Sequence, residues 1–370
     1  MVTRSAEPLK LLPRLDAKPW GGRRLADWGI ALPPEERIGE ALLTAPEATV
    51  ASGEAAGTPL GELVRLAPEA WIGARGLEAT GGRELFPLLI KLIDAQTDLS
   101  IQVHPDDQAA AAAKLGTGKT EAYHILAAEP GSVLYLGLVS EARREDFATA
   151  CLRADGAAAQ MLRQLVVTRG MTTLIPAGTP HAPGAGMVIY EIQQPSNVTY
   201  RLDDWGRVDA DGKPRALHHA EGLPLVDPSS RPEPIAPIPL GDGPAARMLL
   251  VATRYFALER IVPAAGERVQ LAAVASPQVF TCLAGTGALE TSGGSVFVTT
   301  GETVIVPVGM ATRLTVEEGA VLLRGWVPNL PSDVIDPARA AGSSESAIHQ
   351  LGLSGGHAVT PNADEAGEGV

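Results

Sequence analysis

The sequence predicts a mostly-β protein with two related barrels and a small helical insert, and two observations carry this prediction. The 370 residues include 40 Gly and 30 Pro but few long helical patterns, a composition that favours short strands and turns over helix bundles. A strand, a Pro-x-Gly turn and a second strand also occur twice at the same spacing, in residues 170–181 and 301–312. The second copy has Thr312 where the first has His181. We therefore expect two barrels of one design, of which the second lacks the imidazole that His181 supplies in the first.

The elements of the first domain follow in order along residues 1–235. Short strands broken by Pro and Gly are expected before residue 100, and Asp106 or Asp107 is placed to cap an Ala-rich helix that ends at Gly116. Apolar residues at helical spacing between about 140 and 168 predict the small helical insert. The other strands expected in this domain are 121–126, 133–136, 172–175, 187–193 and 198–202.

A Pro-rich stretch over residues 227–239 predicts the domain boundary, so that the second, metal-free domain comprises residues 236–330. Its strands, separated by Gly-containing turns, suit a small barrel or sandwich. They are expected at 246–253, 267–273, 278–284, 286–291, 294–299, 302–307 and 320–326. Residues 331–370 contain no aromatic residue and predict a mobile tail that includes a docked piece near 348–353.

Composition excludes several classes of partner. The formal net charge of −13 argues against nucleic acid and gives no reason to expect an anionic membrane surface. Cys151 and Cys282 lie in apolar surroundings, so we expect two buried thiols and no disulfide. Residues 1–18 have no apolar core of signal-peptide length, and no apolar run is long enough to span a bilayer. A cytoplasmic protein, monomeric or a small homo-oligomer, is the simplest expectation.

Four side chains are candidates for a metal site in the first barrel. Gln102 and His104 lie two apart in a predicted strand and therefore point to the same face. Glu121 opens the next predicted strand, and His181 follows the Pro-x-Gly turn, whereas His124 has the wrong parity to face the same side as Glu121. Two imidazoles, one carboxylate and one amide suit Zn²⁺, Mn²⁺, Fe²⁺ or Co²⁺ and lack the thiolates of a closed structural zinc site. Taken singly, each of these residues is more often structural or solvated than a ligand.

Five sequence segments together resemble type I phosphomannose isomerase, also called mannose-6-phosphate isomerase. They are 89–91 (Leu-Ile-Lys), 99–106 (Leu-Ser-Ile-Gln-Val-His-Pro-Asp), 118–121 (Gly-Lys-Thr-Glu), 176–181 (Pro-Ala-Gly-Thr-Pro-His) and 197–207. The likeness runs over about residues 10–330. The Gln-x-His-Pro-Asp and Lys-Thr-Glu segments carry its specificity, while Pro-x-Gly-x-x-His alone indicates only a cupin. Residues 38–42 lack a Trp that usually follows in the family, and the tail after 331 has no counterpart that we recognise.

The resemblance implies two cupin (jelly-roll-like) barrels and one zinc ion on the residues matching Gln102, His104, Glu121 and His181. It also implies a metal-dependent aldose–ketose isomerase that interconverts mannose 6-phosphate and fructose 6-phosphate through an enediol or enediolate. The implied partner is thus a small sugar phosphate. Two alternatives remain open, a non-catalytic two-cupin protein that binds sugar phosphate and another metal-dependent cupin enzyme. Among the other metal-dependent cupin reactions, oxygen chemistry fits less well. Its metal sites usually have three imidazoles or two imidazoles and one carboxylate, and not Gln as the first ligand.

The expected roles of the remaining site residues follow from their chemistry and from the resemblance. Arg201 matches the family's catalytic arginine, and its permanent charge suits an enediolate or phosphate better than proton abstraction. Lys119 and Glu191 are the candidates for proton transfer, although Lys119, like Lys91, is also a candidate phosphate ligand. Ser100 shares a face with the predicted ligand strand and is expected to hydrogen-bond phosphate.

Structural roles for the charged residues also remain open at this point. Arg201 is placed to pair with either of two nearby aspartates, Asp203 or Asp204, in a surface ion pair of little energetic weight. Glu191 is equally suited to partner an arginine. The two lysines are also consistent with solvated strand ends.

Overall fold

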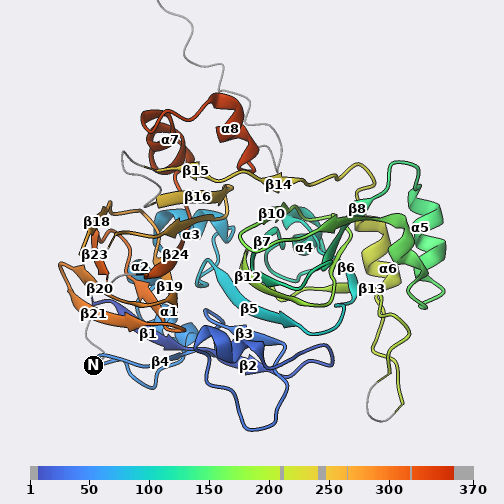
Figure 1. Cartoon of the computed structure of the whole chain (residues 1–370), viewed down its shortest axis with the longest axis horizontal. Helices are drawn as coiled ribbons and strands as arrows, with labels where there is room; N and C mark the ends of the chain where they lie inside the picture. The colour runs from blue at the N-terminus through green and yellow to red at the C-terminus, as the bar shows by residue number, and fades with distance from the viewer. Residues whose placement is uncertain (1–6, 209–211, 241–246, 265, 317–318, 354–370) are drawn as a thin grey trace, which may run out of the picture.

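The computed structural model describes residues 7–208, 212–240, 247–264, 266–316 and 319–353. Two barrels lie side by side in it, and each consists of two antiparallel sheets (Figure 1). The mostly-β, two-barrel fold class predicted from the sequence is confirmed. Within the described residues, no helix combines the length and the apolar character needed to cross a bilayer.

The first barrel is formed mainly by the middle of the chain. Its larger sheet has, in spatial order, β14 (Pro234–Ile235), β10 (Thr172–Ile175), β7 (Glu121–Ala128), β12 (Met187–Gln193), β5 (Leu89–Ala95), β3 (Glu40–Leu42) and β2 (Arg14–Asp16). Its smaller sheet has β13 (Tyr200–Asp203), β6 (Ile101–Val103), β11 (His181–Pro183), β8 (Val133–Leu138) and β9 (Leu162–Val166).

The second barrel has an eight-stranded and a four-stranded sheet. The larger comprises β15 (Ile238–Pro239), β16 (Arg247–Ala252), β17 (Ala257–Ile261), β24 (Val321–Trp326), β19 (Gln278–Ala284), β22 (Thr303–Val306), β1 (Leu9–Leu12) and β4 (Thr49–Val50). The smaller comprises β18 (Arg268–Leu271), β23 (Thr312–Val316), β20 (Thr286–Thr291) and β21 (Gly294–Thr299). The predicted ranges locate seven of these strands and give no bounds for β1, β4, β15, β17 and β23.

The N-terminal strand departs from the predicted division of the chain at residue 235. β1 pairs antiparallel with β22, with Leu9 opposite Ile305, and thus extends the second barrel's larger sheet. The predicted first domain, residues 1–235, includes this strand and therefore assigns it to the first barrel. The pairing partners are far apart in sequence, and no local pattern indicates which barrel such a strand joins.

Short helices connect and cover the sheets. The α-helices are α1 (Leu60–Leu66), α2 (Pro68–Trp71), α3 (Gly73–Ala79), α4 (Asp107–Ala112), α5 (Arg144–Cys151), α6 (His219–Gly222), α7 (Asp336–Ala340) and α8 (Glu345–Gln350). The 3₁₀ segments are η1 (Arg24–Trp28), η2 (Ala157–Met161) and η3 (Leu223–Leu225), and η4 (Leu330–Ile335) is π-helical. Asp106 caps α4, and its side chain accepts the Ala109 N–H.

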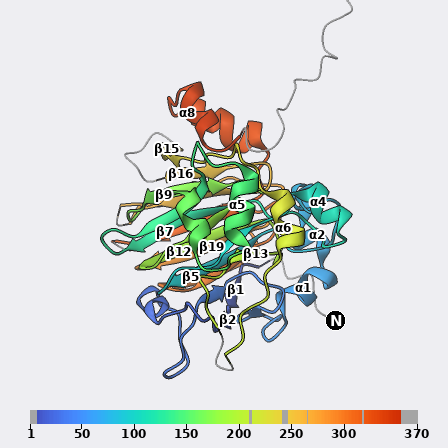
Figure 2. The same cartoon turned by 90° about the vertical axis from the view of Figure 1, so that its right-hand side faces the viewer.

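The helical insert predicted for 140–168 is correct only for its first part. α5 and η2 lie within it, and Figure 2 shows α5 over the outer face of the smaller sheet. Phe147 and Cys151 of α5 are buried there with Ile101 and Ala182. Residues 162–166, predicted as helix, instead form strand β9, which pairs with β8. Burial alternates along β9, so the period is that of a strand.

The prediction of a mobile tail is wrong for the part of the tail that is described, which ends at residue 353. η4, α7 and α8 follow one another, and Ser344 caps α8 by accepting the Ala347 N–H. Val334, Ile348 and Leu351 are buried in the main core, in agreement with the docked piece predicted near 348–353. Small aliphatic side chains at helical spacing suffice to dock the segment without any aromatic residue.

The two large sheets pack back to back and form the main core. Ile90 and Ile192 of the first barrel point towards Gly325 of the second, where an added Cβ would lie 3.3 and 3.0 Å from their Cδ1 atoms. Glycine therefore allows the sheets to approach closely. Because side chains alternate along a strand, the neighbouring Lys91 and Glu191 point into the first barrel. The inter-barrel core thus supports one wall of that barrel's interior.

The strand registers show which residues of the second barrel replace the predicted metal ligands of the first. In the repeated motif, residue 175 corresponds to 306 and residue 181 to 312. Pairing from these positions makes Gln278, Thr312 and Leu271 the counterparts of Glu121, His181 and Gln102. The pairings are Glu121↔Ile175 with Gln278↔Val306, and His181↔Gln102 with Thr312↔Leu271.

The same registers show a buried ion pair with reversed polarity. Lys91 lies opposite Glu191 in the first barrel, and at the equivalent positions of the second barrel Glu259 lies opposite Arg324. The Arg324 guanidinium is 2.9 Å from Glu259 Oε1, donates to Gln278 Oε1 at 2.8 Å and lies over the Trp326 ring. A fixed arginine thus supplies the positive charge within the second barrel.

The reversed pair gives a test of how the second barrel is stabilised. Arg324→Met leaves Glu259 buried, and Arg247, whose side chain is 25% exposed, is then its one ion-pair partner among the described residues, so we expect a loss of about 3–5 kcal/mol in the free energy of unfolding. The double variant Glu259→Leu/Arg324→Met removes both charges and should recover part of this loss. Urea unfolding measures the free energy of unfolding of both variants. A double variant less stable than Arg324→Met would contradict the view that an unpaired, buried Glu259 causes the loss.

Candidate functional site

The interior of the first barrel opens into a cavity of about 250 Å³. Polar and charged side chains line it, and they include six of the nine residues singled out in the sequence: Lys91, Ser100, Gln102, Lys119, Glu191 and Arg201. The remaining three, His104, Glu121 and His181, form a buried cluster whose nearest atoms contact Gln102 and Lys119. The structure therefore brings together all nine.

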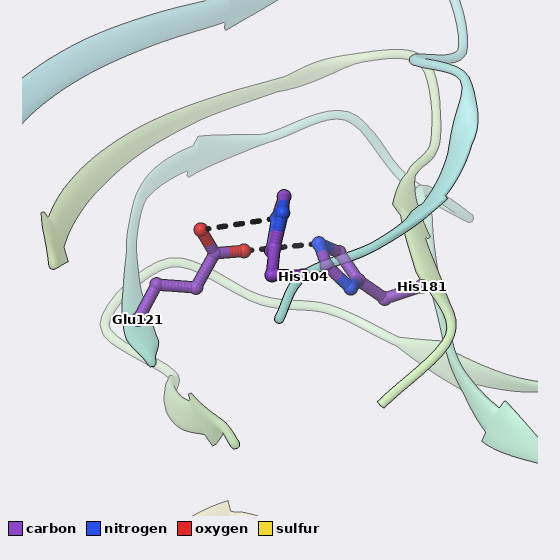
Figure 3. Close-up of side chains that lie close together, drawn as sticks. All are labelled: His104, Glu121 and His181. Atoms are coloured by element: carbon purple, nitrogen blue, oxygen red, sulfur yellow. Dashed lines mark ion pairs between the residues drawn. The ribbon is translucent and has the colours of Figure 1, made fainter. Parts of the chain in front are cut away.

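The four predicted metal ligands come from three separate strands of the two sheets. Gln102 lies on β6 with His104 just beyond it, Glu121 begins β7 and His181 begins β11. Figure 3 shows the Glu121 carboxylate facing both imidazoles, with one of its oxygens directed at each ring. Its oxygens lie 2.9 Å from His181 Nε2 and 3.5 Å from His104 Nε2, and one ligand atom from each of these three residues lies within 4.8 Å of the others. Gln102 Nε2 is 3.2 Å from His181 Nε2.

Backbone carbonyls fix the orientation of both imidazoles. His104 Nδ1 lies 2.9 Å from the Val198 carbonyl oxygen, and His181 Nδ1 lies 2.9 Å from that of Thr179. A carbonyl only accepts hydrogen bonds, so Nδ1 carries a proton in each ring, and Nε2 is the nitrogen that faces the cluster. This is the arrangement by which proteins orient histidine ligands of metals.

The charge states of the cluster fit a divalent cation. Burial, followed by the charge of Lys119, lowers the pKa of His104 to about 3, so its ring is neutral. Burial alone would raise the pKa of Glu121, but Lys119 and His104 hold it well below its ordinary value. The neutral His104 ring, the Glu121 carboxylate and the His181 ring therefore converge in a closed space, and a Gln102 amide rotated to present its oxygen completes a nitrogen-and-oxygen donor set.

Two lysines and a carboxylate lie beside this cluster. Lys119 Nζ is 2.7 Å from Glu121 Oε2, 3.0 Å from His104 Nε2 and 3.9 Å from Glu191 Oε1. Lys91 Nζ is 3.1 Å from Glu191 Oε2. Glu191 therefore partners lysines and not an arginine, and neither lysine is a solvated strand end, since both are buried.

The environment of Glu191 suits proton exchange. Burial raises its pKa to about 7, against the opposing effect of Lys91 and Lys119. Burial alone would lower the pKa of Lys91, but Glu191 raises it above the ordinary value, so Lys91 remains charged. A carboxyl group whose pKa lies near neutrality can both accept and return a proton.

Arg201 lies at the edge of the cavity, opposite Gln102 in the pairing of β13 with β6. Burial, followed by the charge of Arg215, lowers its pKa. Its guanidinium donates to the Ala216 carbonyl at 2.8 Å and has no ion-pair partner among the residues that the structure describes. It is thus available to an anion that enters the cavity.

The proposed surface pair of Arg201 with an aspartate is wrong. Asp204 instead binds Arg207 at 2.6 Å and also Arg215, and Asp203 accepts the Gly156 and Trp205 N–H groups.

Several residues of this site were not predicted from the sequence. Tyr123 donates its hydroxyl to Glu121 Oε1 at 2.8 Å, and its position two residues after Glu121 on one strand already places both on the same face. Glu40 on β3 faces Lys91 at 3.9 Å, and Arg215 lines the cavity. No local pattern marks these two, because each reaches the cavity only through tertiary packing.

Comparison with known proteins decides the family. The family model described as phosphomannose isomerase type I, catalytic domain, matches residues 9–130. The mannose-6-phosphate isomerase ManA of Bacillus subtilis (strain 168) is 36% identical over 234 residues, which are 62% of this chain and 71% of ManA. The chain belongs to the type I phosphomannose isomerase family. The resemblance seen in the sequence motifs is thereby confirmed.

A further relative and two solved structures are also similar to this chain. A mannose-6-phosphate isomerase of Streptococcus mutans is 34% identical over 226 residues, covering 60% of this chain and 68% of that protein. The crystal structure of the mannose 6-phosphate isomerase from Bacillus subtilis superposes with a TM-score of 0.73 at 26% identity, over 86% of this chain and 99% of that one. A variant phosphomannose isomerase from Salmonella typhimurium shares the fold, with a TM-score of 0.70 at 16% identity over 86% and 99% of the two chains.

The buried cluster predicts a specific loss of metal. Glu121→Gln removes the cluster's only carboxylate, so we expect affinity for a divalent cation to fall at least about 100-fold, beyond what the loss of a supporting group usually costs. Metal bound per chain after dialysis, measured by atomic emission, gives the readout. The control Asp16→Asn makes the same change elsewhere on the cavity wall and should keep its metal. Equal metal retention in both variants would contradict the assignment.

Proposed function

We propose that this protein is a zinc-dependent aldose–ketose isomerase that interconverts mannose 6-phosphate and fructose 6-phosphate. The observation that carries the proposal is the single cavity in which a buried ligand cluster, a carboxyl group of near-neutral pKa and a free guanidinium meet. Membership of the family and the printed activities of ManA and the Streptococcus mutans enzyme support it.

We assign the two proton transfers of the reaction to two different residues of the cavity. Isomerisation moves a proton from C2 of the aldose to C1 of the ketose, and a second proton moves between the two oxygens. Glu191 is the proposed base, which takes the carbon-bound proton and returns it to the neighbouring carbon. Lys119, in contact with the cluster and with Glu191, is placed to move the proton between the oxygens.

Gln102, His104, Glu121 and His181 would hold the zinc ion. When bound, zinc supplies a Lewis acid that polarises the carbonyl and the neighbouring hydroxyl. The same donor set also accepts Mn²⁺, Fe²⁺ or Co²⁺, and we propose zinc because the family resemblance implies it.

Arg201, Lys91 and Ser100 are the proposed anchors of the anionic substrate. With a net charge of −13 over the chain, a sugar phosphate needs a local group of positive charges to bind. Arg201 and Arg215 supply such charges at one side of the cavity, and the Ser100 hydroxyl lies among the lining groups. Arg201 is the residue we propose to hold the phosphate or the developing enediolate.

No observation favours a non-catalytic sugar-phosphate-binding protein. Such a protein would have no use for a buried carboxyl group poised between two lysines. The cytoplasmic location and the monomeric or small oligomeric state stay predictions.

A coupled assay tests the proposed reaction. Metal-replete protein given mannose 6-phosphate should form fructose 6-phosphate, lose this activity on chelation, and regain it when zinc is added back. Absence of product from metal-replete protein would refute the reaction, and full activity after complete removal of metal would refute the role of zinc.

Arg201→Ala separates catalysis from metal binding. Loss of the guanidinium should lower kcat/KM about 100-fold, a typical effect for one group that stabilises developing charge. Bound metal should be unchanged, since Arg201 contacts none of the cluster's ligand atoms in the structure. The control Arg313→Ala removes an exposed arginine of the second barrel and should leave both quantities unchanged. Arg201→Ala protein with wild-type turnover would contradict the role.

A further inference from the structure

Residues 117–120 carry Lys119 into the site and lead directly to Glu121, yet they lie outside every strand. This segment passes against the start of α4. A Cβ on Gly118 would lie 2.6 Å from both the Asp106 carbonyl carbon and the Asp107 nitrogen, so only glycine fits there. Since no β-ladder fixes the segment, other groups must hold it.

Two side chains bind the backbone on both sides of Lys119. Asp107 Oδ1 accepts the Gly118 N–H at 2.9 Å and an N–H of the Gln194 amide at 2.9 Å. Gln194 is buried, and its Oε1 accepts the Thr120 N–H at 2.9 Å. The Lys119 N–H itself donates to the Pro105 carbonyl. Asp107 is therefore the hub of the contacts that set the position of Lys119 and Glu121.

The other oxygen of Asp107 is held by the second barrel. Tyr255, in the turn between β16 and β17, donates its hydroxyl to Asp107 Oδ2 at 2.6 Å. The turn is itself fixed, because the Thr253 hydroxyl accepts the N–H groups of Tyr255 and Phe256. The Asp107 side chain is 42% exposed, so without a partner of this kind water would compete for its orientation.

We propose that Tyr255 is a positioning residue for the active site, and that through Asp107 the second barrel sets the geometry of Lys119 and Glu121. The inference rests on the proposed function of the first barrel. It gives the second barrel, whose own equivalent positions carry Gln278, Thr312 and Leu271, a part in the reaction. The part is exercised by the Tyr255 hydroxyl, 2.6 Å from Asp107 Oδ2, and the exposed Arg254 guanidinium lies 3.3 Å from the same oxygen.

The fold supplies a matched control for this hydroxyl. Tyr190 of the first barrel lies 3.2 Å from the Thr281 hydroxyl of the second, which is also an inter-barrel contact of a buried tyrosine. It has no hydrogen-bonded link to residues 117–121 in the described part of the chain. Tyr255→Phe and Tyr190→Phe thus each remove one inter-barrel hydroxyl, and only the first removes a group that holds Asp107.

The test compares these two variants in the full-length, metal-loaded protein. Tyr255→Phe should lower both kcat and zinc affinity about tenfold, as expected for a group that orients a ligand segment, with KM changed less than twofold. Tyr190→Phe should lose similar stability to urea while kcat and zinc affinity stay at wild-type values. Equal effects of the two variants on kcat and zinc affinity would overturn the proposal.

A double-variant cycle tests the route through Asp107. If Tyr255 acts by holding this carboxylate, Tyr255→Phe should have no further effect on zinc affinity in an Asp107→Asn background. Independent, additive effects would overturn the route. Wild-type protein that neither binds zinc nor isomerises the sugar phosphate would instead refute the proposed function, so the two failures are distinguishable.

Discussion

The site depends on one constraint, the convergence of the Nε2 atoms of two imidazoles on a buried carboxylate. His104 and His181 each give their Nδ1 proton to a backbone carbonyl, which leaves Nε2 of both rings facing Glu121. Electron pairs that meet in a closed space repel one another unless a positive charge lies among them. The charged groups around this cluster are Lys91, Lys119, Glu191 and Arg201, and their positions are defined relative to the positive charge that the cluster would hold.

The second barrel shows how the same design is stabilised without a metal ligand set. Where the first barrel has Lys91 opposite Glu191, the second has Glu259 opposite Arg324, and the guanidinium also binds Gln278. The positive charge in the second barrel is thus the side chain of Arg324, and Glu259 and Gln278 of the same barrel bind it. The second barrel packs against the first through the two large sheets and presents Tyr255 to Asp107.

Much of the site could be predicted because strand parity is local information. The spacing of Gln102 and His104 places both on one face, and the same rule applied to Glu121 would also have found Tyr123. The repeat of the Pro-x-Gly turn indicated two barrels and the replacement of His181 by Thr312. Long-range partners were beyond reach, since the pairing of β1 with β22 and the docking of residues 330–340 depend on surfaces formed only after folding.

The central claim is that one ion binds between the two imidazoles and the carboxylate, and anomalous diffraction from zinc-loaded crystals tests it most directly. The account predicts a single strong peak at the zinc edge, about 2.0–2.1 Å from Nε2 of both His104 and His181, with a Glu121 oxygen also in the coordination sphere. A peak elsewhere in the molecule, or a fully loaded crystal without a peak at this cluster, would contradict it.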